Sequence, residues 1–434
     1  MSALGDAAAA LLEAAKRAGA EVAEVGLCKG ASVGLQRRLR KIEETERAET
    51  TELGLRVFLG RCSASVSASS IDHGAFVRLA EQAVAMAKVV PEDPFAEIPF
   101  APPAQDAAFL ELDDPVEPTA DVLIKRATLA EEAALAVPGI TNSEGGSASW
   151  SRSISVLANS HGFLGEYARS SHGISITAIA GSGTDMQRDY DFDFVIHGAD
   201  LGDAAQLGRN AAARALARLN PKRPATAKLP VLFDPRVSGS ILSHFAGAIS
   251  GASIARGTSF LKDALGQQVF RHGINVVDDP LRVRGRRSRP FDREGQSVKR
   301  MHFIEDGRLT DWVLDTRSAN QLGLKTNGHA GGLSNFYMEP GSMTPEQLMA
   351  DITEGLYVTE MLGSSVNGLT GDYSRGAAGF MIRGGQIAEP VAEFTIAGNL
   401  KDMFLNLTPA SDLKFKYGTD APTLRIEGMT LAGA

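Results

Sequence analysis

Apolar and polar residues alternate with a two-residue period over most of residues 21–68, which predicts consecutive antiparallel strands behind an alanine-rich helix at 2–20. Gly60 and Arg61 have the composition of a turn between two of these strands. The segment 75–90 then places its apolar side chains on one helical face, so we expect a helix that covers the sheet. The expected strands are short and cover residues 21–27, 31–36, 41–51, 54–59 and 62–68.

Proline recurs between residues 91 and 118, where it fixes extended backbone and breaks helices, so this stretch is interpreted as a surface connection. Beyond it, Tyr190, Phe192 and Phe194 alternate with other residues, mainly aspartates, which is the pattern of a half-buried strand with one aromatic face. Further strands are expected over 152–158 and 173–180, and further helices over 119–136 and 202–219.

Residues 220–224 have the sequence Asn-Pro-Lys-Arg-Pro, which is typical of a linker. We therefore place a domain boundary here, between an N-terminal α+β domain (1–224) and a C-terminal α+β domain (225–434). Strands and helices do not alternate as parallel units would. The expected fold class is thus α+β, with two domains of mostly antiparallel sheet and flanking helices.

The C-terminal domain begins with an expected strand at 229–233 and a helix at 235–251. Two dipeptides in it are strong hairpin signals, because they favour the tight turns that join antiparallel strands. These are Asp306-Gly307 and Gly384-Gly385.

The 434 residues include 52 acidic and 44 basic side chains, which gives a formal net charge of −8. This charge repels phosphate backbones at long range, and it disfavours general nucleic-acid binding. The segment Arg282–Arg293 is a local exception, since its arginines could neutralise a phosphate, a carboxylate or an acidic partner surface. The simpler interpretation is a solvated loop with a few ion pairs.

The two cysteines, Cys28 and Cys62, lie outside any Cys-x-x-Cys or Cys/His cluster, so we expect reduced packing residues. The N-terminal helix carries acidic residues and has no basic leader. No stretch approaches the roughly twenty apolar residues of a membrane helix. We therefore expect a cytoplasmic protein that does not act at a membrane.

A self-sufficient catalytic site cannot be identified from the sequence. None of the eight histidines belongs to a His-Glu-x-x-His motif, and no phosphate-binding loop is present. Ser238 and Ser240 open a helical stretch, but no base stands at an interpretable spacing, which leaves a serine nucleophile as a minor alternative. His244 in the same stretch is more simply a packing or interface residue, because one histidine cannot hold a metal unaided.

Glycines are frequent between residues 323 and 385, and they let one backbone approach another closely. Such a region can form tight turns of an antiparallel sheet, or it can shape a groove in which an extended peptide pairs with a sheet edge. The candidate groove residues are Arg256, His329, Asp372, Tyr373 and Arg375.

Several separated blocks, in matching order over nearly the full length, resemble the TldD/PmbA peptidase family and specifically its PmbA (TldE) branch. They are Thr45-Glu46-Arg47, Leu53-Gly54-Leu55-Arg56-Val57-Phe58, Ala255-Arg256-Gly257-Thr258-Ser259-Phe260, Arg289-Pro290-Phe291-Asp292-Arg293-Glu294-Gly295 and Gly398-Asn399-Leu400-Lys401-Asp402-Met403-Phe404.

The resemblance implies where a zinc site would have to lie. The zinc-bearing members of the family carry His-Glu-x-x-x-His on a helix, with a cysteine near the C-terminus as third ligand. The corresponding stretch here begins at Leu242 and ends at Gly247, with Ser243 at the glutamate position and His244 out of register. No cysteine follows Cys62. We therefore expect neither metal, cofactor nor catalytic residue in this chain.

The resemblance also implies a role as the non-catalytic subunit of a heterodimeric metallopeptidase. Its zinc-bearing sister would cleave extended or unfolded peptides, and the two subunits would meet through their C-terminal domains; a homodimer of the chain alone stays open. The family's older name, modulator of DNA gyrase, suggests an alternative. In that alternative the chain is a regulatory protein that acts through Arg282–Arg293 on a nucleic-acid-associated target.

Overall fold

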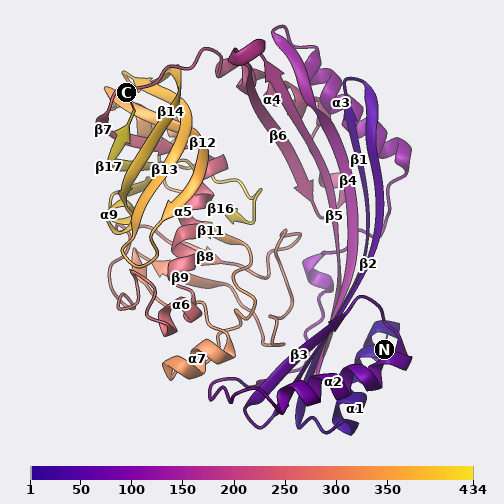
Figure 1. Ribbon diagram of the computed structural model, residues 1–434. Coiled ribbons are helices and arrows are strands. Elements are labelled where there is room, and N and C mark those ends of the chain that lie inside the picture. Colours follow the sequence, from indigo (N-terminus) through magenta and orange to yellow (C-terminus); the bar gives the residue numbers. More distant parts are fainter. Residues whose placement is uncertain (1, 434) are drawn as a thin grey trace.

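The computed structural model describes residues 2–433, which form two α+β units of mostly antiparallel sheet with flanking helices (Figure 1). This confirms the fold class expected from the sequence. The N-terminal unit is built on a six-stranded antiparallel sheet in the order β3-β2-β1-β4-β5-β6. Its elements are α1 (Ala3–Arg17), β1 (Val22–Arg38), β2 (Lys41–Leu59), β3 (Cys62–Ala68), α2 (Phe76–Ala87), α3 (Ala120–Leu135), β4 (Ile140–Asn159), β5 (Leu164–Ala180), β6 (Gln187–Val195) and α4 (Ala204–Ala217).

The first two strands are longer than expected. β1 continues through Gly30, and β2 continues through residues 52 and 53, so the expectation of short separate strands is wrong. A Cβ atom at Gly30 would lie 3.1 Å from Oγ1 of Thr50 and 3.4 Å from the carbonyl oxygen of Arg152. This glycine therefore permits close approach of the neighbouring strands and does not form a turn.

Helices α1–α4 all cover the same face of this sheet. Near the N-terminus, α1 and α2 bury a cluster that includes Leu11, Val25 and Leu55, whereas α3 and α4 cover the other end. A Cβ atom at Gly208 of α4 would lie 2.1 Å from the carbonyl oxygen of Ala130 in α3. The close packing of these two helices therefore depends on a glycine at this position. In Figure 1 the sheet forms a curved arm, with α3 and α4 on its outer side.

The alternation predicted around Phe192 is present in β6, which is an edge strand of the sheet. Phe192 meets Tyr417 and Lys416 of the C-terminal unit, at ring and cation distances of 5.6 and 4.6 Å. Asp189 and Asp191 point to the opposite face and are buried. The aromatic residues thus face the C-terminal unit, and the aspartates face α4.

The other edge of the sheet is only partly covered. β3 pairs with residues 53–59 of β2, so on the side of β2 that faces away from β1 no described strand pairs with residues 41–52. Side chains in this stretch are mostly exposed. Its charged residues are Lys41, Glu43, Glu44, Glu46, Arg47, Glu49 and Glu52.

The C-terminal unit contains two further sheets. One has the order β14-β13-β12-β7-β17-β15, with an additional pairing between β14 and β17, and the other has the order β10-β9-β8-β11-β16. Its strands are β7 (Ala227–Phe233), β8 (Val276–Asp278), β9 (Met301–Glu305), β10 (Arg308–Leu309), β11 (Phe336–Met338), β12 (Glu354–Val366), β13 (Asp372–Arg383), β14 (Gln386–Asn399), β15 (Leu407–Pro409), β16 (Thr419–Asp420) and β17 (Leu424–Ala432).

Both hairpins predicted for this unit are confirmed. Asp306-Gly307 joins β9 to β10, and Gly384-Gly385 joins β13 to β14 with positive φ at both glycines. The helices of the unit are α5 (Pro235–Ala248), α6 (Gly251–Ala255), α7 (Thr316–Leu322), α8 (Pro345–Met349) and α9 (Leu400–Leu405).

The core of the C-terminal unit is built around α5. Phe245 of α5 is fully buried and contacts the rings of Phe270, Phe336 and Phe404, with centroid distances of 5.1, 6.2 and 5.9 Å.

Both cysteines of the chain are free. None of the helices described for residues 2–433 combines the length and the apolar character needed to cross a membrane.

Glu24 of β1 lies near the C-terminal unit, where a carboxylate is poorly solvated. Burial raises the pKa of Glu24 to about 7; the charge of Arg56 opposes this shift, and the charge of Asp292 adds to it. Because this pKa lies above its unfolded value of 4.5, the associated stability is present below pH 4.5 and is lost as the pH rises through 7.

We expect Glu24→Gln to raise the melting temperature at pH 8 and to leave it almost unchanged at pH 4.5, because the amide removes only the cost of ionisation. Thermal melts of both proteins across this pH range test the prediction. Glu44→Gln, at an exposed position on β2, is the matched control and should have no such effect. A gain from Glu24→Gln that is equal at both pH values would contradict this account.

Candidate functional site

Helix α5 carries the positions at which the sequence resemblance places a metal motif. Its start is fixed by Asp234, whose carboxylate accepts a hydrogen bond from the backbone N–H of Arg236, and by Pro235 in the first turn. Its core face includes the fully buried Leu242. The opposite face is exposed at Ser243 and Gly247.

The side chains at these positions do not fit a zinc ion. Leu242 is 0% exposed within the hydrophobic core. The hydroxyl of Ser243 donates to the carbonyl oxygen of Gly239 at 3.0 Å, and Gly247 has no side chain to offer. Within residues 2–433, no three His, Cys, Asp or Glu side chains come together closely enough to hold a metal ion. No metal-dependent step is therefore assigned to this chain.

His244 lies between these positions and packs on the sheet beneath α5. Its ring meets Tyr373 of β13 edge-to-face, with the centroids 5.8 Å apart and the planes at 79°. Three buried polar atoms in this small region have no hydrogen-bond partner: Nε2 of His244, the hydroxyl oxygen of Tyr373 and Nε of Arg375. Unpartnered buried polar atoms are rare in folded proteins, and each carries a desolvation cost.

The electrostatic field around His244 is positive. Burial lowers the pKa of His244, and the guanidinium of Arg375 lowers it further. Burial raises the pKa of Tyr373 well above its usual range, although Arg375 acts in the opposite direction. His244 is therefore neutral at pH 7, and Tyr373 keeps its proton.

A cavity of about 410 Å³ opens beside α5, between the two units of the fold. The N-terminal sheet lines one side, and α5, β12 and β13 line the other. Val237 and Ser240 of α5 border it, and helical spacing places His244 one turn further along the same face. Its charged lining residues are Glu144, Arg188, Asp189, Arg218, Arg236, Glu360 and Arg375.

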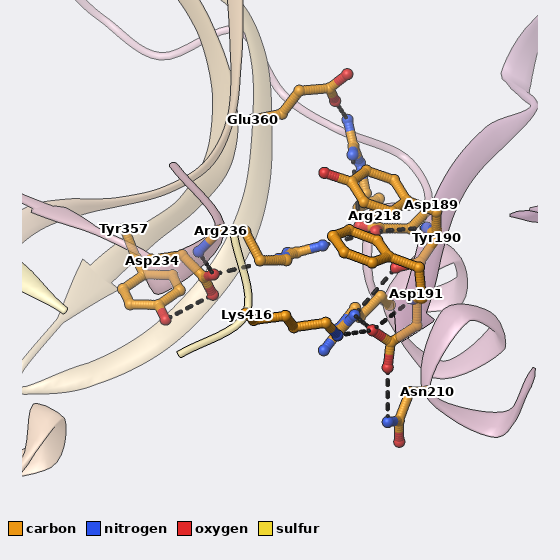
Figure 2. Close-up of polar contacts among 12 residues, drawn as sticks. Asp189, Tyr190, Asp191, Asn210, Arg218, Asp234, Arg236, Tyr357, Glu360 and Lys416 are labelled. Carbon is orange, nitrogen blue, oxygen red and sulfur yellow. Dashed lines mark hydrogen bonds and ion pairs between the residues drawn. The ribbon is translucent and has the colours of Figure 1, made fainter. Parts of the chain in front are cut away.

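Charged side chains at this cavity join the two units across the edge of β6 (Figure 2). The buried carboxylate of Asp189 binds Arg236 of α5 at 2.7 Å and Arg218 at 3.5 Å. Arg218 also pairs with Glu360 of β12. Nearby, Lys416 binds Asp191 at 2.9 Å. Because these pairs are well shielded from water, they fix the position of the C-terminal unit against the sheet.

Arg375 differs from the other arginines of the cavity. Arg188 pairs with Glu144 at 2.8 Å, and Arg218 and Arg236 share Asp189. Within the described part of the chain, Arg375 has no carboxylate partner. Arg236 also pairs with Asp234 at 3.2 Å, so Arg375 is the cavity guanidinium that forms no ion pair among the described residues.

The structure separates the candidate groove residues. Asp372 and Tyr373 border a second hollow of about 720 Å³ beside Thr258, and Arg375 borders the first cavity. Arg256 follows α6, close in sequence to Thr258. His329 lies elsewhere: it is 3% exposed, and its Nε2 lies 3.2 Å from Asp278 in the second sheet.

Most arginines of the segment Arg282–Arg293 make contacts within the chain. Arg284 pairs with Glu111 at 2.6 Å and with Asp200 at 2.8 Å, both in the N-terminal unit. The other contacts join Arg282 to the ring of Phe415, Arg286 to the carbonyl oxygen of Lys416, Arg287 to Thr419, and Arg289 to the carbonyl oxygens of Ala330 and Gly332. This segment therefore ties the two units together.

The serines at the start of α5 are engaged in structural hydrogen bonds. The hydroxyl of Ser238 is fully buried and donates to the carbonyl oxygen of Ala421 at 3.0 Å. The hydroxyl of Ser240 donates to the carbonyl oxygen of Val237 at 2.6 Å. Neither arrangement resembles a hydroxyl activated by a base.

Sequence reasoning missed the residues that complete this site from other elements. Asp189, Arg218, Arg236 and Glu360 come from four separate segments, and no local spacing relates them. The paired aspartates on a strand otherwise rich in aromatic residues were the only available signal. Arg375 was found, but as part of a groove with His329 and not as a neighbour of His244.

Comparisons with known proteins place the whole chain in one group. Family models described as PmbA/TldA metallopeptidase domain 1, central domain and C-terminal domain match residues 23–87, 113–219 and 226–433. The chain is 37% identical to Metalloprotease PmbA of Escherichia coli O157:H7, over 95% of this chain and 92% of that protein. It is 36% identical to a Metalloprotease PmbA homolog of Haemophilus influenzae, over 97% and 94% of the two chains.

Solved structures share the fold at lower sequence identity. A putative modulator of DNA gyrase from Bacteroides thetaiotaomicron superimposes with a TM-score of 0.89 at 23% identity, over 99% of this chain and 98% of that one. TldE from Thermococcus kodakarensis superimposes with a TM-score of 0.86 at 19% identity, over 98% and 100% of the two chains. At these identities the likeness concerns the fold.

We expect Arg375→Gln to raise the pKa of His244 towards the ordinary histidine value of about 6.5, because it removes a nearby positive charge. Histidine ring signals followed by NMR across pH 4–8 measure this shift. Arg188→Gln removes a charge from the same cavity at a position paired with Glu144, and it should leave the titration unchanged. Equal shifts in both variants would contradict the placement of Arg375 beside His244.

We expect Asp189→Ala to lower the free energy of unfolding by about 2 kcal/mol, because it removes the shared partner of two shielded arginines, which then keep only Glu360 and Asp234. Urea denaturation measures this loss. Glu144→Gln breaks the more exposed pair with Arg188 and should cost at most about 1 kcal/mol. Similar losses in the two variants would show that Asp189 has no special role in joining the units.

Proposed function

This chain belongs to the PmbA/TldD metallopeptidase family, and we propose that it serves there as a non-catalytic subunit. In this role it assembles with a zinc-bearing sister subunit and supports the access of extended or unfolded peptides to the sister's active site. The family membership rests on the full-length relatives. The division of labour between two subunits is our proposal.

The main support for the proposal is the set of residues that α5 carries at the expected metal-ligand positions. Zinc needs nitrogen, sulfur or oxygen ligands that converge in a tetrahedral arrangement. At the ends of the expected motif stand Leu242, which is sealed in the core, and Gly247, which has no side chain. The remaining imidazole, on His244, faces the cation Arg375, which disfavours a metal ion at that position.

A second candidate function is regulation of a nucleic-acid-associated target through Arg282–Arg293. The name "putative modulator of DNA gyrase", carried by the Bacteroides thetaiotaomicron structure, is the observation that favours it. The contacts of Arg284 with Glu111 and Asp200 weaken this candidate, because the guanidinium is already neutralised within the chain. We therefore prefer the peptidase subunit.

We expect the purified chain to hold no stoichiometric zinc and to cleave no unstructured peptide. Co-expressed with a zinc-bearing family member from the same organism, it should copurify as a complex that cleaves the peptide in a chelator-sensitive manner. Metal analysis and peptide mass spectrometry with and without EDTA test both points. Chelator-sensitive cleavage by the isolated chain would defeat the proposal.

Matched substitutions at one motif position distinguish the roles of the two subunits. In the complex, Ser243→Ala in this chain should leave the cleavage rate within about two-fold of the wild type. Replacing the motif glutamate of the sister by glutamine should abolish cleavage, because that carboxylate activates the zinc-bound water. A comparable loss from Ser243→Ala would place chemistry on α5 of this chain.

A further inference from the structure

We propose that His244, Tyr373 and Arg375 form a binding site for a carboxylate group of an extended peptide. The site lies under α5, where Arg375 borders the cavity between the two units. The inference rests on the proposed function for the source of the carboxylate, since peptides are the substrate class proposed for the complex. The chemistry of the site is argued from the residues themselves.

Unsatisfied buried polar atoms are concentrated around His244. Nε2 of His244, the hydroxyl oxygen of Tyr373 and Nε of Arg375 are all buried without a partner, and Tyr373 is only 1% exposed. Thr359 of β12, which also lines the cavity, has an unpartnered buried hydroxyl as well. A ligand that accepts hydrogen bonds at this point would remove the desolvation cost of several groups at once.

The three side chains of the site are hydrogen-bond donors of a kind that suits a carboxylate. A tyrosine hydroxyl, a guanidinium and a neutral imidazole can all donate hydrogen bonds, and a carboxylate offers about four acceptor positions in a plane. Arginine matches this geometry well, because its planar fork can bind both carboxylate oxygens. Tyr373 and Arg375 are two residues apart on β13, so their side chains share one face of the sheet.

The positive charge of Arg375 favours an anion at this site. The other cavity arginines pair with Glu144, Asp189, Asp234 and Glu360, whereas Arg375 forms no ion pair with a carboxylate of the described residues. A monoanion neutralises this charge, whereas a metal cation would be repelled by it. A phosphate dianion would exceed the single available charge. A carboxylate suits both the single charge of Arg375 and the planar fork of its guanidinium.

Two hollows adjoin the site. Arg375 borders the cavity of about 410 Å³, and Tyr373 borders the neighbouring hollow of about 720 Å³. The pair thus stands between two spaces that can receive parts of one peptide. The carboxylate can come from the C-terminus of the peptide or from an aspartate or glutamate side chain, because both present the same group.

The test uses N-acetylated, unstructured peptides of Ala, Ser, Gly and Thr and the full chain without its sister. One peptide ends in a free carboxylate, the second in an amide, and the third in an amide but with one internal glutamate. Isothermal titration calorimetry measures the affinities, and NMR of the His244 ring reports contact with the site. We expect at least one carboxylate peptide to bind about ten-fold or more tightly than the uncharged amide.

The preference should depend on the proposed residues. Arg375→Gln and Tyr373→Phe should each remove most of it, and Arg375→Lys should keep part of it, because the charge remains but the fork is lost. Arg188→Gln is the matched control and should leave the preference intact, since Arg188 is already paired with Glu144. If Arg375→Gln does not fold, Arg375→Lys and Tyr373→Phe still show whether the preference depends on these two residues.

Two results would overturn the inference. Equal affinities of the wild type for all three peptides would show that no carboxylate is recognised. Equal losses in Arg188→Gln and Arg375→Gln would show only a general effect of cavity charge. Both results are obtained with the isolated chain. The proposed function is tested by zinc content and by assembly with a sister subunit, so failure of the carboxylate site can be distinguished from failure of the proposed function.

Discussion

The burial of one face of α5 between the two sheets of the C-terminal unit determines most of what the site can be. Phe245 meets three other phenylalanine rings, and Leu242 is sealed in the same core. A polar ligand at residue 242 would need its own hydrogen-bonding shell in this apolar environment. The packing that stabilises the unit is therefore incompatible with the metal motif, and what remains exposed on α5 is a face of small residues around one histidine.

The relative position of the two units depends on a second constraint, at the edge strand β6. An edge strand has no neighbouring strand on one side. Side chains from another unit can therefore reach past it and contact residues on either face of the sheet. Arg236 and Lys416 do this, and they bind aspartates that point toward α4. These contacts, drawn in Figure 2, hold the two units together on one side of the cavity beside α5.

The sequence predicted most elements that local patterns determine. The helices near 76–87, 120–135 and 204–217 and both hairpins of the second half follow from apolar periodicity and from turn chemistry. The continuity of β1 was missed, because a glycine in a strand can mark a turn or a close contact, and only the neighbouring strand decides between them. The site was less predictable, since His244 and Arg375 are brought together by the packing of a helix on a sheet.

The uncovered stretch of β2, residues 41–52, also limits how copies of this chain can associate. An open strand edge is a template for pairing with another such edge, and this is a common route to aggregation. Here five glutamates outnumber Lys41 and Arg47, so two antiparallel copies would bring carboxylates close to one another. Like charges across a strand pair are destabilising. The acidic edge therefore disfavours association of copies of the chain through this sheet, and high salt, which screens exposed charges, should weaken this effect.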